Sequence, residues 1–343
     1  MRLGEKKSVA LVLSGGGIKA AAFHLGVCLA LREKGFQFAG GTKEEVQLRY
    51  PDDRLTFKIY VGSSAGSFIT SLLASGHSVE SIIDAFERGA ESELNKFSRK
   101  RKIFTRLKPI TYREIFAVNG TNFLDSLPGF LKRKSLVTGG LEAFLKNGFK
   151  LNGLFTTKNI ERYLRTNVLK ENSFSSLGVK SYVIATQLNH SRKVVFGDFP
   201  ETYKVKNIKY ANFASISDAV AASTSLPPFF APYGIKNQKG KELFFFDGEI
   251  RDTLSTHVAA DAGADLVIAS YSIQPYHYNP VMGSLHNYGI PLIINQALYQ
   301  VIQQKIEKHI DHQQQIAAIM SAVDGYFRQQ GLPDEHREKL IEI

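Results

Sequence analysis

The feature that most constrains this fold is a series of short, uniformly apolar runs, each followed by a helical pattern. The clearest runs are SVALVLS at 8–14, FKIYVGS at 57–63 and LVIASYSI at 266–273. Strands of this kind are buried on both faces, and their alternation with helices is typical of a parallel sheet. KSYVIATQL at 180–188 and KELFFFDGE at 241–249 predict further strands. We therefore predict an α/β fold with a mainly parallel central sheet flanked by helices.

Two stretches depart from this alternation, and both predict additions to a single α/β domain spanning 1–343. Between 91 and 177 the strand signals vanish and basic residues cluster, which predicts an inserted helical cap. From 290 to 343 the pattern is helical, which predicts C-terminal helices packed on the core. The apolar residues of this last region recur every fourth position: Ile294, Leu298, Ile302, Ile306 and Ile310.

The formal net charge of +11 is concentrated in one part of the chain. Residues 96–150 contain thirteen Lys and Arg, against Glu114, Asp125 and Glu142. A field of this kind attracts phosphate-bearing partners and weakens as salt rises. We expect the basic region 96–150 to bind an anionic membrane surface. A nucleic acid is the alternative partner, and a solvated loop without a partner is the structural alternative.

Cysteine usage and hydropathy indicate where the protein works. The single cysteine, Cys28, excludes an intrachain disulfide framework. The N-terminal residues lack the apolar core of a secretory signal, and no run approaches the roughly 18 apolar residues of a spanning helix. We therefore expect a cytoplasmic protein with peripheral membrane attachment. Nothing in the sequence indicates an oligomeric state.

The first chemical motif is a glycine loop between a predicted strand and a predicted helix. Consecutive glycines at Gly15, Gly16 and Gly17 allow a sharp turn that aims backbone N–H groups at one point before the helix. The anion held there is either a nucleotide phosphate or the oxyanion of an acyl intermediate. Because Gly15, Gly17 and Ala20 also satisfy the dinucleotide pattern G-x-G-x-x-G/A, the loop alone leaves both alternatives open.

The second motif is Gly62-Ser63-Ser64-Ala65-Gly66, which follows a predicted strand and precedes a predicted helix. A nucleophile elbow needs this arrangement, since Gly62 and Gly66 tolerate the strained turn that exposes the central hydroxyl. Ser64 is therefore the candidate nucleophile. A dinucleotide site needs an acidic residue near the end of this second strand, and none is present. Dinucleotide binding becomes the alternative function.

The third motif is Asp247-Gly248, at the end of another predicted strand. A carboxylate at the carboxyl end of a strand fits a catalytic base in an open α/β sheet. Taken alone, Asp-Gly is also a common turn. Together with the two motifs above it makes Asp247 the candidate base of Ser64.

These pieces, in this order between Val9 and Asp252, resemble the patatin-like phospholipase family. GGGIKA resembles its glycine block, GSSAG its serine elbow and DGE its aspartate block, and AVAASTSLPPFFAP at 219–232 is similar to the segment before that aspartate. The resemblance implies a lipid acyl hydrolase with a Ser64–Asp247 dyad, without histidine, metal or cofactor. It also implies an oxyanion hole at Gly15, Gly16 and Gly17, supported by Lys19, Gly62, Gly66 and Gly248.

Several residues depart from the family's pattern. Glu249 stands where Gly or Ala is usual, Ala20 replaces a glycine, and Thr253 and Ser255 stand where Asn and Pro often occur. Lys19 replaces the commoner Arg and keeps its positive charge, so it either braces the loop or meets a phosphate. These departures leave the dyad intact and affect the turn beside Asp247.

Three functions follow as hypotheses. The leading one is hydrolysis of phospholipid or lysophospholipid esters, and the others are dinucleotide binding and nucleic-acid binding by the basic region. A Ser-His-Asp triad is the mechanistic alternative, because three candidate histidines follow Asp247 in the chain order of α/β-hydrolases. We expect each of them to have a structural or surface role, since none lies in a recognisable motif: His257, His277 and His286.

Overall fold

The fold is described from a computed structural model of the chain, which describes residues 6–51, 54–94, 107–111, 115, 117–118 and 153–331. Within these residues the strands are β1 (Val9–Leu13), β2 (Gln37–Phe38), β3 (Thr56–Ser63), β4 (Ala117–Val118), β5 (Phe155–Thr156), β6 (Lys180–Gln187), β7 (Arg192–Phe196), β8 (Tyr203–Val205), β9 (Ile208–Ala211), β10 (Tyr233–Lys236), β11 (Glu242–Asp247) and β12 (Leu266–Ser270). The α-helices are α1 (Gly17–Glu33), α2 (Lys43–Arg49), α3 (Ala65–Ala74), α4 (Val79–Leu94), α7 (Lys158–Asn167), α8 (Ile216–Ser223), α9 (Thr256–Asp261) and α10 (Ile290–Gln329).

The central sheet confirms the predicted α/β class. Its order is β12-β1-β3-β6-β7-β9-β8, and the pairs β12–β1, β1–β3 and β3–β6 are parallel. Antiparallel pairs begin at β6, which bonds both β7 and β11. Only the short 3-10 helix Leu188–His190 links β6 to β7, and so tight a connection returns the chain antiparallel because a parallel neighbour needs a longer crossover.

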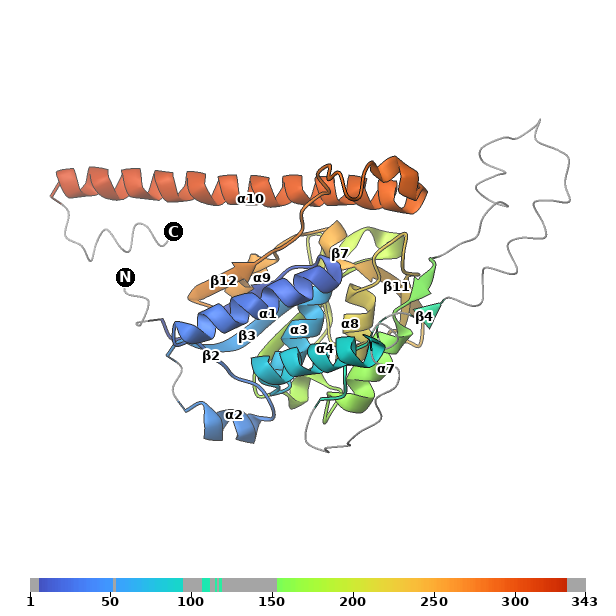
Figure 1. The fold of residues 1–343 in the computed structure, drawn as a ribbon. Coiled ribbons are helices and arrows are strands. Elements are labelled where there is room, and N and C mark those ends of the chain that lie inside the picture. The colour runs from blue at the N-terminus through green and yellow to red at the C-terminus, as the bar shows by residue number, and fades with distance from the viewer. Residues whose placement is uncertain are drawn as a thin grey trace, which may run out of the picture.

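Alternate residues of β1 face opposite sides of the sheet, as the two-residue period of a strand requires. Val9, Leu11 and Leu13 pack into the larger core, and Ala10 and Val12 pack into a second core beneath α9. Helices α1, α3, α4 and α8 lie together over one face in Figure 1. Burial on both faces explains why the strand at 8–14 is uniformly apolar.

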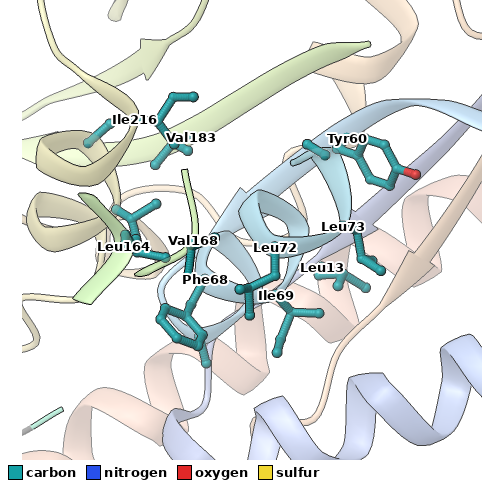
Figure 2. Packing of buried hydrophobic residues seen from close by; sticks show 14 of the residues in the cluster. Leu13, Tyr60, Phe68, Ile69, Leu72, Leu73, Leu164, Val168, Val183 and Ile216 are labelled. Atoms are coloured by element: carbon teal, nitrogen blue, oxygen red, sulfur yellow. The ribbon is translucent and has the colours of Figure 1, made fainter. Parts of the chain in front are cut away.

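Helix α3 lies at the centre of the larger core. Every one of its residues from Ala65 to Ala74 is buried. Figure 2 shows Phe68, Ile69, Leu72 and Leu73 among side chains from neighbouring strands and helices. Because α3 is buried on all sides, its three hydroxyl-bearing residues Ser67, Thr70 and Ser71 included, the segment that follows the candidate nucleophile is enclosed by the core.

Most of the predicted cap lies outside the described residues. Of the basic region 96–150, only 107–111, 115 and 117–118 are described, so its predicted membrane contact is not tested. Within 91–177 the structure places the end of α4, a short antiparallel pair of β4 and β5, and α7.

The helical C-terminus is a single continuous helix of 40 residues, α10, where several helices were predicted. In Figure 1 it crosses one edge of the domain and extends beyond it. Of its predicted stripe, Ile302 and Ile306 are buried against Leu254 and Ile273. Ile294 is exposed, because it lies in the first turns of the helix, before the turns that contact this core. Across the described residues, no helix combines the length and the apolarity that crossing a bilayer would require.

Candidate active site

The turn between β3 and α3 carries Ser64 in a strained backbone conformation. Ser64 has φ 51° and ψ −126°, a region that side-chain-bearing residues rarely adopt. The flanking glycines allow the close packing around it. A Cβ at Gly62 would overlap the hydroxyl of Thr70, and one at Gly66 would overlap the carbonyl group of Leu13. Ser64 therefore lies in a strained strand-to-helix turn, at the position where the sequence predicts an elbow.

Two hydroxyl groups hold this turn in place. The backbone N–H of Ser64 donates to Oγ of Ser223 at 2.8 Å, and that hydroxyl donates to the carbonyl oxygen of Ile184 at 2.6 Å. On the other side, the Ser67 hydroxyl donates to the carbonyl oxygen of Ser64 at 2.6 Å. Helix α8 therefore anchors the elbow to β6 through Ser223, a residue that the sequence analysis missed.

Asp247 lies at the end of β11 and is only 1 % exposed. Burial raises its pKa to about 7, and the nearby Ser64 hydroxyl and the backbone N–H of Glu249 partly offset that rise. The Glu249 N–H donates to Oδ1 of Asp247 at 2.9 Å. The structure thus brings Asp247 to the Ser64 hydroxyl as a carboxyl group that titrates near neutral pH.

Gly248 lets this turn approach the sheet. A Cβ at Gly248 would overlap the carbonyl oxygen of Ile184 and would lie 2.6 Å from Oγ of Ser63. The predicted supporting role of Gly248 is therefore a matter of space, as it is for Gly62 and Gly66.

The glycine loop lies against both Ser64 and Glu249. The Gly15 N–H, predicted as an oxyanion donor, has another partner in the structure. The Gly15 N–H donates to Oε1 of Glu249 at 2.8 Å, so it points at a carboxyl group of the protein. Gly16 and Gly17 have φ values of 132° and 71°, and Gly17 begins α1. Within the described residues no acceptor meets their N–H groups. Two of the three predicted donors remain available to an oxyanion.

An apolar cavity of about 120 Å³ opens beside Ser64 and Gly17. Its walls come from α1, α3, α4, α7 and the segment after α8, and its lining residues are Gly17, Ile18, Ala21, Ser64, Ala65, Phe68, Phe86, Ile115, Ile160, Thr224, Leu226 and Phe230. Nearly all of this surface is hydrocarbon, so the cavity fits an alkyl chain better than a nucleotide.

His24 holds the glycine loop from inside α1. It is fully buried, its Nε2 donates to the carbonyl oxygen of Ser14 and its Nδ1 accepts from Ser270 Oγ, both at 2.9 Å. Burial lowers its pKa, so the ring is neutral at pH 7. The sequence offered only an isolated histidine in an apolar helix, and its partner Ser270 is 246 residues away.

The other predicted residues lie apart from this cluster. His257 contacts Nζ of Lys193 at 2.8 Å and faces Asp252, while His277 and His286 are exposed. Among the described residues, none of these histidines bonds Ser64 or Asp247. The side chain of Lys19 is exposed and forms no hydrogen bond or ion pair within the described part of the chain, so its supporting role stays a prediction.

Comparison with known proteins identifies the family. The family model described as patatin-like phospholipase matches residues 11–260. Among solved structures, the crystal structure of VipD from Legionella pneumophila is similar, with 19 % sequence identity and a TM-score of 0.31. The alignment covers 72 % of this chain and 47 % of that one, so this chain spans about half of VipD's length. A comparison with curated proteins found no match.

Proposed function

We propose, from the premise that this chain belongs to the patatin-like phospholipase family, that it hydrolyses the fatty acyl esters of phospholipids or lysophospholipids. Membership supports lipid acyl hydrolysis in general terms. The observation that carries the specific proposal is the meeting of the Ser64 hydroxyl with the buried Asp247 carboxyl, at the mouth of an apolar cavity. Nucleophile, base and acyl-chain site then share one location.

In the proposed reaction, Asp247 accepts the Ser64 proton as Oγ attacks the ester carbonyl carbon. The tetrahedral intermediate breaks down when Asp247 returns that proton to the leaving alcohol, which leaves an acyl-Ser64 ester. A water molecule, deprotonated by Asp247, then attacks the acyl carbonyl carbon. As the bond between that carbon and Ser64 Oγ breaks, Asp247 returns the proton to Oγ and the fatty acid is released. Asp247 must be ionised to start each half of this cycle, and its pKa of about 7 allows that at neutral pH.

The oxyanion of each intermediate is held by the backbone N–H groups of Gly16 and Gly17, helped by the positive end of the α1 dipole. Donors of this kind are fixed in advance and need no reorganisation during the reaction. Loss of one such donor typically costs about 3 kcal/mol of transition-state stabilisation. Because carboxylate is a weak base for an alcohol, this contribution is essential to the proposal.

The alternative of dinucleotide binding receives no support from the site. The Gly15 N–H already bonds a carboxyl group, and Ser64 occupies the space in front of the loop, since a Cβ at Gly15 would lie 2.7 Å from Cβ of Ser64. A pyrophosphate bound there would also lie near the carboxyl groups of Asp247 and Glu249, which would repel its negative charge when ionised. Among the described residues, no Lys or Arg forms an ion pair with either carboxyl group.

Covalent labelling tests the nucleophile. A fluorophosphonate probe is expected to label the wild-type chain, to lose labelling in Ser64→Ala and to keep it in Ser75→Ala, a serine at the far end of α3. Ester hydrolysis is expected to vanish in Asp247→Asn and to persist in His257→Ala. Labelling that survives in Ser64→Ala, or an inactive His257→Ala, would overturn the proposed dyad.

The membrane partner needs a separate test, because the basic region lies mostly outside the described residues. Replacing Lys132, Arg133 and Lys134 by Gln is expected to weaken binding to vesicles that contain anionic phosphatidylglycerol. The binding should also fall as salt rises, because screening weakens long-range attraction. Unchanged, salt-independent vesicle binding would contradict the proposed role of 96–150.

A further inference from the structure

Glu249 is a buried residue to which the reaction above gives no role. It follows Asp247 by two positions in the 3-10 helix Gly248–Ile250 and is 1 % exposed. Its N–H donates to Oδ1 of Asp247 at 2.9 Å, and its own Oε1 accepts the N–H of Gly15 at 2.8 Å. One residue therefore joins the aspartate turn to the glycine loop.

The Glu249 side chain also packs against Gly15. A Cβ on Gly15 would be 2.7 Å from Cβ of Ser64 and 2.8 Å from Cγ of Glu249, so both side chains lie against this glycine. Glu249 therefore helps to fix where the glycine loop lies beside Ser64. A shorter side chain would remove both the acceptor of the Gly15 N–H and the packing of Cγ against Gly15.

The electrostatic surroundings favour a neutral Glu249. Asp247 and Glu249 are both almost fully buried, and within the described residues neither forms an ion pair with Lys or Arg. Two adjacent buried carboxyl groups do not readily carry two charges, so they behave as a coupled pair. Burial, and then the charge of Asp247, raise the pKa of Glu249 to about 8.

Other groups face Glu249 from every element packed on it. Asp247 and Asp252 contribute negative charge. Lys193 of β7 and Lys305 of α10 contribute positive charge at longer range. Hydroxyl groups come from Ser63 of β3 and Tyr299 of α10. The Ser63 hydroxyl is close enough to favour the ionised form, yet Oε2 of Glu249 has no partner in hydrogen-bonding geometry among the described residues. That oxygen is available to carry a proton.

We propose that Glu249 is a positioning residue, which as a neutral carboxylic acid fixes Gly15 against Ser64 and leaves Asp247 as the only anion of the site. The inference rests on the proposed hydrolase function. Oε1 orients the loop that presents the N–H groups of Gly16 and Gly17, and the proton resides on Oε2. An ionised Glu249 places a second negative charge where the oxyanion develops, which opposes the reaction.

The pH dependence of hydrolysis tests this role with a soluble short-chain ester. The wild-type rate is expected to rise as Asp247 ionises near pH 7 and to fall as Glu249 ionises near pH 8. Glu249→Gln keeps the Gly15 acceptor without a charge, so it should keep the rise and lose the fall. Glu249→Ala should be at least about tenfold slower at every pH, since it loses the acceptor that places the oxyanion loop. The exposed Glu242→Gln serves as control.

Two kinetic results would overturn the proposal: a falling limb that survives in Glu249→Gln, or an Ala variant that equals the Gln variant. Thermal unfolding provides a readout that needs no activity. Between the ordinary pKa of 4.5 and about 8, folded Glu249 keeps a proton that the unfolded chain has lost, so folding weakens as pH rises. The wild-type melting temperature should therefore fall across this window more than that of Glu249→Gln.

The two readouts separate the inference from the function on which it rests. A wild-type chain that neither reacts with a fluorophosphonate nor cleaves the ester would end the hydrolase proposal. In that case the melting curves still decide the state of Glu249. Equal pH dependence in wild type and Glu249→Gln would overturn its neutral form, and a steeper wild-type curve would support it.

Discussion

The Ser64 elbow and the Asp247 turn lie beside neighbouring residues of β6, but they differ in what opposes their folded conformation. The elbow carries no charge and has a strained backbone, with φ 51° at Ser64 and glycines where a side chain would collide. The aspartate turn has an ordinary backbone, with φ −46° and ψ 134° at Asp247, and buries a carboxyl group. The elbow raises the free energy of the folded chain through steric strain, and the aspartate turn raises it through burial of a charge.

This difference predicts opposite responses to mutation. Strain of order 1 to 3 kcal/mol persists at the elbow only because the surrounding contacts enforce it, so loss of those contacts should destabilise the fold. The buried charge of Asp247 opposes folding, so its neutralisation should stabilise the fold while it abolishes catalysis. The predictions below test whether the two halves separate in this way.

The largest expected effect is on catalysis in Asp247→Asn. An amide keeps the shape and the acceptor of the Glu249 N–H but cannot take the Ser64 proton, so kcat for ester hydrolysis should fall about a thousandfold to ten-thousandfold. Steady-state kinetics at pH 8 measure this. A fall of less than about tenfold would assign the base elsewhere and remove the contrast between the two halves.

The stability of the same variant relative to the wild type should increase as pH rises. Folded Asp247 titrates near 7 instead of 3.8, so between these values the folded chain binds a proton that the unfolded chain has lost, and wild-type stability declines with pH. Asp247→Asn lacks this decline and should be more stable at pH 8 by up to about 4 kcal/mol, with little difference below pH 4. Urea unfolding at both pH values measures it, with the exposed Asp198→Asn as control.

Gly66→Ala should act in the opposite direction. The added Cβ would overlap the carbonyl group of Leu13 and lie 2.6 Å from the carbonyl oxygen of Ser14, so the elbow must move away from β1. We expect a loss of about 3 kcal/mol in unfolding free energy. The matched control is Gly26→Ala in α1, where a Cβ meets open space and a gain of about 0.5 to 1 kcal/mol is expected. Equal effects at both glycines would contradict the steric account.

The smallest effect is expected from Ser223→Ala. It leaves the buried N–H of Ser64 without its acceptor, which should cost about 1 to 2 kcal/mol of stability and slow hydrolysis in proportion. Ser71→Ala is the comparison, because the hydroxyl of Ser71 is buried without a hydrogen-bond partner among the described residues and its loss should be close to neutral. If both variants behave alike, Ser223 does not hold the elbow.

The two halves also differ in how far sequence could predict them. Gly62 is required by the nearby Ser67 and Thr70, and the pattern G-x-S-x-G indicates the elbow from five consecutive residues, although the contact that requires Gly66 comes from Leu13. The pairing of Gly15 with Glu249 joins residues 234 positions apart, and nothing local indicates it. The sequence therefore predicted that the glycine loop holds an anion and could not predict that one of its donors meets the chain's own carboxyl group.

Strand prediction failed for a related reason. The mainly apolar runs at 8–14, 57–63 and 266–273 appear as β1, β3 and β12. Strand β7 was missed because Lys193 interrupts its apolar pattern. That lysine is buried and is satisfied by Asp252 at 2.5 Å, a contact 59 residues away. Charges neutralised by tertiary structure cannot be distinguished from surface charges in a single sequence.

Helix α10 lies beyond residue 260, where the match to the family ends. Its Tyr299 lies within electrostatic range of both carboxyl groups, Ile302 and Ile306 pack against Leu254 and Ile273, and Lys305 donates to the carbonyl oxygen of Ile250. Helix α10 thus contributes to the burial that raises the pKa values of Asp247 and Glu249. Two relatives with identical motifs and different C-terminal helices are consequently expected to differ in the pKa values of these carboxyl groups.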